Sequence, residues 1–273
     1  MTKATAGLFG PDSVSWRVHG ETTVLFGGAR AILMQAAHPL VIAGATATGF
    51  YERNPWARLE RTLRLTYSIT FGTAEEAQAA ADRINEVHRT VHGIDTVTGE
   101  PYDALDPALL LWVHACLVDS ALEFERRTIG RLSETERQRF HEEQMLAAEM
   151  LGLPRTQIPP TVAGLHAYVD SIVESDRLIV TDAAQKVAAL FREPPKGAQW
   201  RPVLRAISWW AFGTLPPRLR AAYGIHWDPA REAALRGSLL WLRSARPMLP
   251  HRFRRITPAQ RAEARVKELV WRP

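Results

Sequence analysis

Two histidines, His88 and His92, stand four residues apart at the end of a stretch that begins at Trp56. Residues four apart lie on one face of an α-helix, so both imidazoles are predicted to point the same way. Such a pair could bind a divalent metal with a third ligand, or one ring nitrogen could bind haem iron. A histidine on an apolar helix face can also be an ordinary core residue. The spacing alone leaves these interpretations open.

Arginines and a threonine precede the histidines and could face them. Arg58, Arg61 and Thr62 belong to one predicted helix, and a short turn at 71–73 leads into the helix that carries the histidines. Helices joined by so short a turn are antiparallel neighbours. Arg58 and Arg61 could therefore bind an anionic group or activated oxygen, although a solvated helix face fits the same pattern. Thr62 lies one turn after Arg58 and shares its face.

An apolar segment from Ala36 to Gly49 is a candidate wall for a cofactor or substrate. It is rich in Gly, Ala and Thr, although tight helix packing would use the same small residues. His38 precedes Pro39, which should kink the helix, so His38 either caps the kink or lines the pocket. Upstream, Gly27-Gly28 weakens a helix predicted over 21–35 and permits close approach of another helix or a bulky ligand.

The composition is typical of a soluble globular protein, and 273 residues suit one large domain. Cys116 is the single cysteine, so no intrachain disulfide can form. No run of about 20 uncharged apolar residues predicts a transmembrane helix, and the N-terminus lacks a signal-peptide pattern. We therefore expect a cytoplasmic protein. No phosphate loop, Ser-His-Asp arrangement or Cys-x-x-Cys motif supports a nucleotide-binding, hydrolase or thiol-redox function.

Apolar residues recur at helical spacing and no alternating strands stand out, so we predict an all-α, multi-helix bundle in one domain over 1–273. Asp106-Pro107 opens a nearly continuous apolar helix, predicted to be central, with His114 and Asp119 as polar insertions. Residues from about 247 to 273 form a basic extension. The net charge of +5 does not require nucleic acid, and we expect none as a partner. The C-terminal tryptophans could be core, subunit contact or a peripheral membrane surface.

Several local signatures, in order along the chain, together resemble one family. They read GPDSVSWRVHGE, GGARAILMQAAHPLV, NPWARLERTLR, FGT, HRTVHG and LDPALLLWVHACLVDSAL. Over about residues 10–250 the chain resembles the haem-dependent oxygenases that include the latex-clearing proteins (rubber oxygenases) and the MpaB-type oxygenases of fungal mycophenolic acid synthesis. The resemblance implies a globin-like core that binds b-type haem, and an oxygenase that acts on a hydrophobic small molecule with dioxygen.

The same resemblance implies roles for particular residues. In the latex-clearing proteins an Arg and a Thr, spaced as Arg58 and Thr62 are here, precede the proximal haem histidine. The matching residue is His92, which is the expected iron ligand, with Arg58 and Thr62 supporting it in the pocket. Arg61 stands where those proteins have a distal lysine and is expected to stabilise bound dioxygen or its reduced forms. His38 is the further candidate for contact with the cofactor.

One departure from the family bears on the activity. The catalytic glutamate of the latex-clearing proteins has no counterpart here, since the matching stretch from Leu40 to Phe50 contains no acid. We therefore expect a reaction other than rubber cleavage. A haem- or ligand-binding helical protein without turnover is the alternative, and a haem-free α-helical interaction protein is a third possibility. The oligomeric state is left open.

Overall fold

The computed structural model describes residues 7–47, 55–193 and 201–270, and these are almost entirely helical, as predicted. The helices are α2 (Val14–His19), α3 (Thr22–Leu25), α4 (Gly27–Ala36), α5 (Pro39–Thr46), α7 (Pro55–Phe71), α8 (Ala74–His88), α9 (Pro107–Thr128), α10 (Glu134–Met150), α11 (Val162–Glu174), α12 (Asp182–Arg192), α13 (Arg201–Gly213), α14 (Pro217–Ala222), α15 (Pro229–Ala245), α16 (His251–Arg254) and α17 (Thr257–Val270). Two 3₁₀ turns, η1 (Arg155–Gln157) and η2 (Arg246–Met248), and two short strands, β1 (His92–Ile94) and β2 (Pro101–Asp103), complete the described part. Most of the loop predicted at 192–202 lies outside the described residues.

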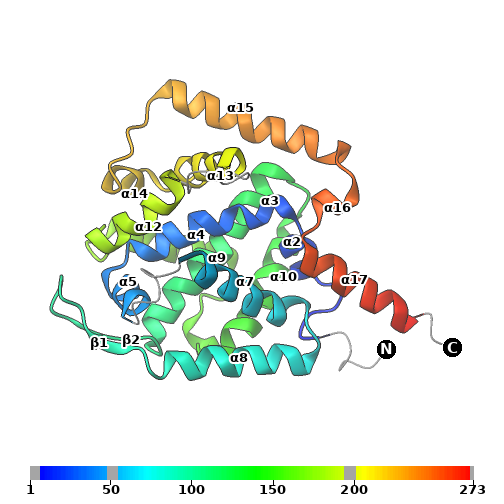
Figure 1. Ribbon diagram of the computed structural model, residues 1–273, viewed down its shortest axis with the longest axis horizontal. Helices are drawn as coiled ribbons and strands as arrows, with labels where there is room; N and C mark the ends of the chain where they lie inside the picture. Colours follow the sequence, from blue (N-terminus) through cyan, green and yellow to red (C-terminus); the bar gives the residue numbers. More distant parts are fainter. Residues whose placement is uncertain (1–6, 48–54, 194–200, 271–273) are drawn as a thin grey trace.

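Helix α9 lies at the centre of the bundle, as its apolar sequence predicts (Figure 1). The Asp106 carboxylate caps it by accepting a hydrogen bond from the Ala108 amide at 2.8 Å, and Pro107 occupies the first position. By length and composition alone α9 could cross a membrane, but half of its most apolar window is buried inside the bundle. The bent pair formed by 22–36 and 39–46 passes the same test with a 105° bend. In α9 the apolar residues are those of a core helix.

Helix α4 packs closely along α9 because a glycine stands at the contact (Figure 1). A Cβ atom added at Gly27 would lie 2.9 Å from Phe124 Cδ2 and 2.9 Å from the Ser120 carbonyl oxygen. Gly28 has no such neighbour within 4 Å. The single helix predicted over 21–35 is wrong in detail, since the chain breaks at Phe26 into α3 and α4. Gly27 is therefore a packing residue.

The polar insertion Asp119 in α9 is paired with a buried cation from α4. Arg30 Nη1 lies 2.6 Å from Asp119 Oδ2 and donates to Ser120 Oγ at 2.7 Å. Arg30 Nε also donates to the Thr214 carbonyl oxygen at 3.0 Å, beyond the end of α13. These bonds pair the two charges inside the core, and Arg30 links α4, α9 and the residue after α13. Arg30 was not singled out from the sequence, although an arginine within an apolar run was the available signal.

The C-terminal segment returns to the N-terminal helices. Arg246 forms a buried two-point ion pair with Glu21, and the Ile256 amide donates to the Gly20 carbonyl oxygen at 2.9 Å. Helix α17 then contributes to a cluster of apolar side chains with α2 and the end of α7, made of Phe9, Trp16, Phe71, Ile256, Ala259 and Ala262. In Figure 1, α15 runs along the upper edge, and α16 and α17 descend on the side of the N-terminus. The predicted extension from about 247 is thus packed against the bundle.

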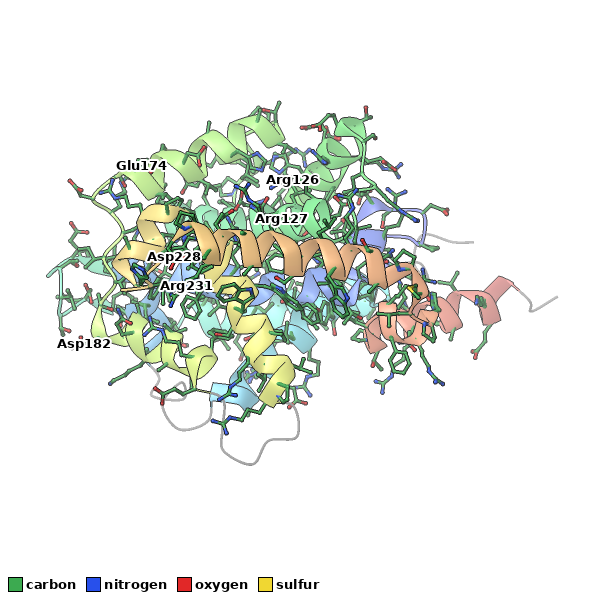
Figure 2. All side chains as sticks on the ribbon, turned by 90° about the horizontal axis from the view of Figure 1, so that it is seen from above. Arg126, Arg127, Glu174, Asp182, Asp228 and Arg231 are labelled. Carbon is green, nitrogen blue, oxygen red and sulfur yellow. The ribbon has the colours of Figure 1, made fainter. Side chains whose placement is uncertain are left out.

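Helix α15 covers the upper face of the bundle. In Figure 2 it crosses the near face, with Arg126 and Arg127 of α9 beside it and Asp228 and Arg231 at its N-terminal end. Asp228 is its N-cap and accepts a hydrogen bond from the Arg231 amide at 2.8 Å. Leu235, which is buried, belongs to the face of α15 that packs on the bundle.

Candidate functional site

The predicted hairpin of two helices is present and consists of α7 and α8. The turn between them is short, and Thr73 and Glu76 have the spacing of a capping box and form one. The Thr73 hydroxyl accepts from the Glu76 amide at 3.1 Å, and Glu76 Oε2 accepts from the Thr73 amide at 2.8 Å. The two helices pack antiparallel, so the first turns of α7 and the last turn of α8 share one end of the hairpin.

The prediction that His88 and His92 share a helix face is wrong. Helix α8 ends at His88, and His92 begins strand β1, opposite Asp103 of β2. The following turn explains the change, because the Asp95 carboxylate accepts bonds from the Thr98 amide at 2.9 Å and its hydroxyl at 2.8 Å. This local hairpin uses backbone groups that a further helical turn would need. The described residues contain no cluster of three or more His, Cys, Asp or Glu side chains that could hold a metal ion.

His88 lies at the end of α8, and one of its ring nitrogens has no hydrogen-bond partner among the described residues. Its side chain is half-buried at the end of α8, and its Nδ1 atom is buried with no hydrogen-bond partner among the described residues. Burial lowers the pKa of His88, so the ring is neutral at pH 7. A neutral imidazole with a free nitrogen lone pair is the form that binds a metal. His92, by contrast, is exposed on β1.

His38 occupies the N-cap position before α5, but its side chain makes no capping hydrogen bond. It is half-buried, and its Nδ1 atom is also buried without a partner among the described residues. Burial, followed by the positive charge of Arg177, lowers the pKa of His38 to about 4, while Asp106 acts in the opposite sense. His38 is thus a second neutral imidazole with an unused nitrogen. Of the two roles expected for it, capping the kink is excluded by this geometry.

Helix α5 is the predicted apolar wall, and it lies beside the chain that follows His88. A Cβ atom added at Gly44 would lie 3.3 Å from Val91 Cγ1 and 3.6 Å from the ring of Tyr102. Only Pro39 and Ile42 of α5 are fully buried, and its other residues are half-buried although none is charged. The part of the predicted wall at 48–49 lies outside the described residues. An uncharged, incompletely covered helix beside the histidine end of the hairpin suits an apolar ligand.

The polar residues of α7 that were predicted to line the site are not buried in it. Arg61 and Thr62 belong to α7, and both are exposed. Arg58 lies within the bounds of α7, but its side chain is outside the described part. Antiparallel pairing puts the first turns of α7 at the same end of the hairpin as His88. The structure therefore brings these residues to one end of the molecule without burying Arg61 or Thr62.

A groove of about 740 Å³ separates α7 from the C-terminal helix α17. Leu63 and Tyr67 of α7 line it, with Ala262 of α17 and the charged side chains Arg64 and Arg261. Tyr67 is largely buried, which raises the pKa of its hydroxyl. Only the return of the C-terminal segment creates this groove.

Two further histidines, the half-buried His114 and the buried His141, lie side by side inside the bundle. The rings of His114 on α9 and His141 on α10 lie 6.5 Å apart, measured between centroids. His141 Nε2 lies 2.7 Å from the Pro159 carbonyl oxygen. Burial, and then the neighbouring His141, lower the pKa of His114 to about 4. These rings are neutral at pH 7, and His114 Nε2 and His141 Nδ1 are, like Nδ1 of His88, buried without a partner among the described residues.

A family model for "ER-bound oxygenase mpaB/B′/Rubber oxygenase, catalytic domain" matches residues 16–244, from α2 to the last turn of α15. The chain belongs to this family. The match confirms the resemblance seen in the sequence, and the family is one of oxygenases. Helices α16 and α17 lie beyond the matched region.

Two relatives of this oxygenase-family chain are the uncharacterized protein Rv2237 of Mycobacterium tuberculosis and the uncharacterized protein Mb2261 of Mycobacterium bovis. Each is 24% identical over 232 residues, which cover 81% of this chain and 88% of the relative. No solved structure matches the chain. Two features of this member bear on haem binding: the Nδ1 atom of His88, which is buried without a partner among the described residues, and the uncharged helix α5.

Proposed function

We propose that this protein is a haem-dependent oxygenase that acts on a hydrophobic small molecule. The observation that carries the proposal is the buried Nδ1 atom of His88, which has no partner among the described residues at the end of an α-helical hairpin in an oxygenase-family chain. A buried polar atom without a partner costs on the order of 1–3 kcal/mol, so it calls for an explanation. An iron ligand bond would satisfy it.

His88 is proposed as the axial ligand in place of His92, which the family resemblance suggested. Burial keeps the His88 ring neutral, so no proton has to leave before it binds. His92 would have to leave the exposed face of β1, where it stands opposite Asp103. Bound haem would supply the binding and activation of dioxygen. The residues of the chain would hold it, exclude water and orient the substrate.

Helix α5 is proposed as the apolar wall of that site. Its uncharged, half-buried residues would cover a macrocycle or a hydrophobic substrate and keep water out. His38, neutral at pH 7, could exchange a hydrogen bond with a polar group at the rim. Arg58, Arg61 and Thr62 remain predictions for the polar side. For Arg61 and Thr62 the only structural support is their position on α7, because both are exposed.

The test compares the two histidines directly. The protein is reconstituted with haemin, and absorbance in the Soret region is measured with a pyridine haemochrome assay for stoichiometry. His88→Gly should lose the spectrum of the wild-type protein and regain it on addition of imidazole, while His92→Gly should keep it. Thermal unfolding of each variant serves as the control for folding.

Each outcome decides between assignments. Loss and imidazole rescue in His92→Gly alone would assign the iron to His92 and refute the role of His88. Wild-type protein that stays colourless with haemin would refute the haem proposal itself.

A second candidate function is haem or ligand binding without turnover. The absence of any acidic side chain in the uncharged helix α5 favours it, since the glutamate of the latex-clearing proteins has no counterpart there. Oxygen uptake with unsaturated lipids or isoprenoids separates the two functions. Uptake above the level of free haemin supports the oxygenase, and haem-loaded protein without uptake supports the binding protein.

A further inference from the structure

Five large apolar side chains are exposed along one short segment, from the end of α15 through η2 to α16. We name them the C-terminal apolar patch. They are Leu240 (63% exposed), Trp241 (68%), Met248 (84%), Leu249 (41%) and Phe253 (55%). Single exposed apolar residues are ordinary, but a run of this kind within 14 residues marks a surface that meets something other than water.

The outer face of α15 continues this surface. Leu235, Leu239 and Leu242 are buried on the bundle side. The opposite side of the helix, read at 100° per residue, carries exposed residues without charge: Ala230, Ala233, Ala234, Gly237, Leu240, Trp241 and Ser244. A surface helix that faces only water normally presents charged residues there. The centre of the outer face of α15 is therefore uncharged, and the exposed Arg236 and Arg243 lie on its flank.

The segment of the chain that carries the patch has charged residues of one sign. Residues 233–262 contain seven arginines and no acidic residue. Arg246 is bound to Glu21, and Arg255 to Glu263, in ion pairs. Arg243 and Arg252 are exposed; the Arg243 guanidinium lies against Gly130, and the Arg252 guanidinium lies over the Phe253 ring at 4.9 Å from its centroid. The apolar patch is thus flanked by free positive charge that complements an anionic surface.

We propose that the C-terminal apolar patch docks this protein on an anionic membrane surface. Exposed Trp and Phe side chains enter the boundary between headgroups and acyl chains, and arginines beside them bind lipid phosphate and carboxylate groups. The ion pair between Arg246 and Glu21 anchors the segment to the bundle, so docking would hold the domain at the lipid surface. A nucleic acid would use the arginines but would leave Leu240 and Met248 in water, so it fits the patch less well.

The proposal does not depend on haem or on turnover. It rests on exposed residues, three of which (Met248, Leu249 and Phe253) lie beyond the family match that ends at residue 244. If the proposed oxygenase function also holds, docking would bring the enzyme to the phase in which hydrophobic substrates dissolve.

The first test is sedimentation with vesicles of phosphatidylcholine and phosphatidylserine in a 70:30 ratio, against pure phosphatidylcholine, at low and high salt. Trp241→Ser with Phe253→Ser should reduce the partition coefficient on the order of tenfold. The matched control is Ile94→Ser with Val97→Ser. These residues are 70% and 59% exposed and belong to the strand hairpin at the opposite edge of the molecule (Figure 1). The control should bind as the wild type does.

The second test concerns charge. Each arginine near an anionic surface contributes a factor of roughly five, so Arg243→Glu with Arg252→Glu should reduce binding at least 25-fold, or about 2 kcal/mol. Arg83→Glu with Arg155→Glu alters two exposed arginines outside the patch and should leave most binding intact. Binding that is equal on neutral vesicles, or unchanged in both patch variants, would overturn the proposal. So would the absence of vesicle binding together with a dimer that Trp241→Ser dissociates, because the occupant would then be a second copy of the chain.

Discussion

Removal of the negative charge of Glu21 should loosen the C-terminal segment and destabilise the whole protein. Arg246 Nε lies 2.9 Å from Glu21 Oε2, and Nη2 lies 2.5 Å from Oε1. The two side chains are 9% and 11% exposed, and Arg255 Nη1 lies 3.8 Å from the same carboxylate. Glu21→Gln leaves the Arg246 guanidinium buried without its counter-ion. Breaking a buried pair costs about 3–5 kcal/mol, far more than losing an exposed one.

The assay is thermal and urea-induced unfolding followed by circular dichroism. For a chain of this size, a loss of 3–5 kcal/mol lowers Tm on the order of 10 °C. Glu21→Gln combined with Arg246→Met removes both charges and should recover a large part of that loss, because no charge is then left buried alone. Glu86→Gln is the matched control. Its partner is Arg83, both side chains are more than half exposed, and the expected cost is below about 1 kcal/mol. A Glu21→Gln variant no less stable than Glu86→Gln would refute the reasoning.

Three further predictions concern the core. The pKa of His114 is lowered to about 4, so the unfolded chain takes up a proton at a higher pH than the folded chain. The free energy of unfolding should therefore fall by about 3 kcal/mol as the pH drops from 6.5 to 4. In urea titrations at each pH, His114→Phe should show a smaller fall. Gly27→Ala should destabilise by about 1–3 kcal/mol in thermal unfolding, because its Cβ meets Phe124, while the unobstructed Gly28→Ala should gain up to about 1 kcal/mol; equal effects would contradict the packing argument. Burial raises the pKa of the Cys116 thiol, so a thiol reagent should label it only in denaturant, and rapid labelling of folded protein would contradict its burial.

Local signals in the sequence predicted where several helices begin. Asp106-Pro107 and the pair Thr73 and Glu76 begin helices as expected, because a cap and its partner lie within four residues of each other. The pairing of Thr257 with Gln260 was also predicted as a capping box. There the prediction is wrong, because Gln260 Nε2 instead donates to the carbonyl oxygens of Arg252 and Arg255. Which acceptor the Gln260 amide bonds to depends on how the chain before α17 is folded.

The most consequential wrong prediction concerned the end of α8. Spacing alone predicted that His88 and His92 face the same way, but the turn at Asp95 and Gly99 and its pairing with β2 draw His92 into a strand. Strands of three residues are too short to show alternation, so they left no periodic signal. The role of His92 as iron ligand remains a prediction, and His88 is the alternative candidate for that role.

The sequence by itself determined the helical class, the family, the two-helix hairpin and the apolar character of α5, because each depends on residues close together along the chain. The tertiary structure decided which polar groups are buried together. It paired Asp119 with Arg30 and Glu21 with Arg246, residues that lie 89 and 225 positions apart. It also left one nitrogen of His88 buried and without a partner among the described residues. Burial and long-range pairing set the charge state and the free lone pairs of these side chains, and no local pattern encodes either.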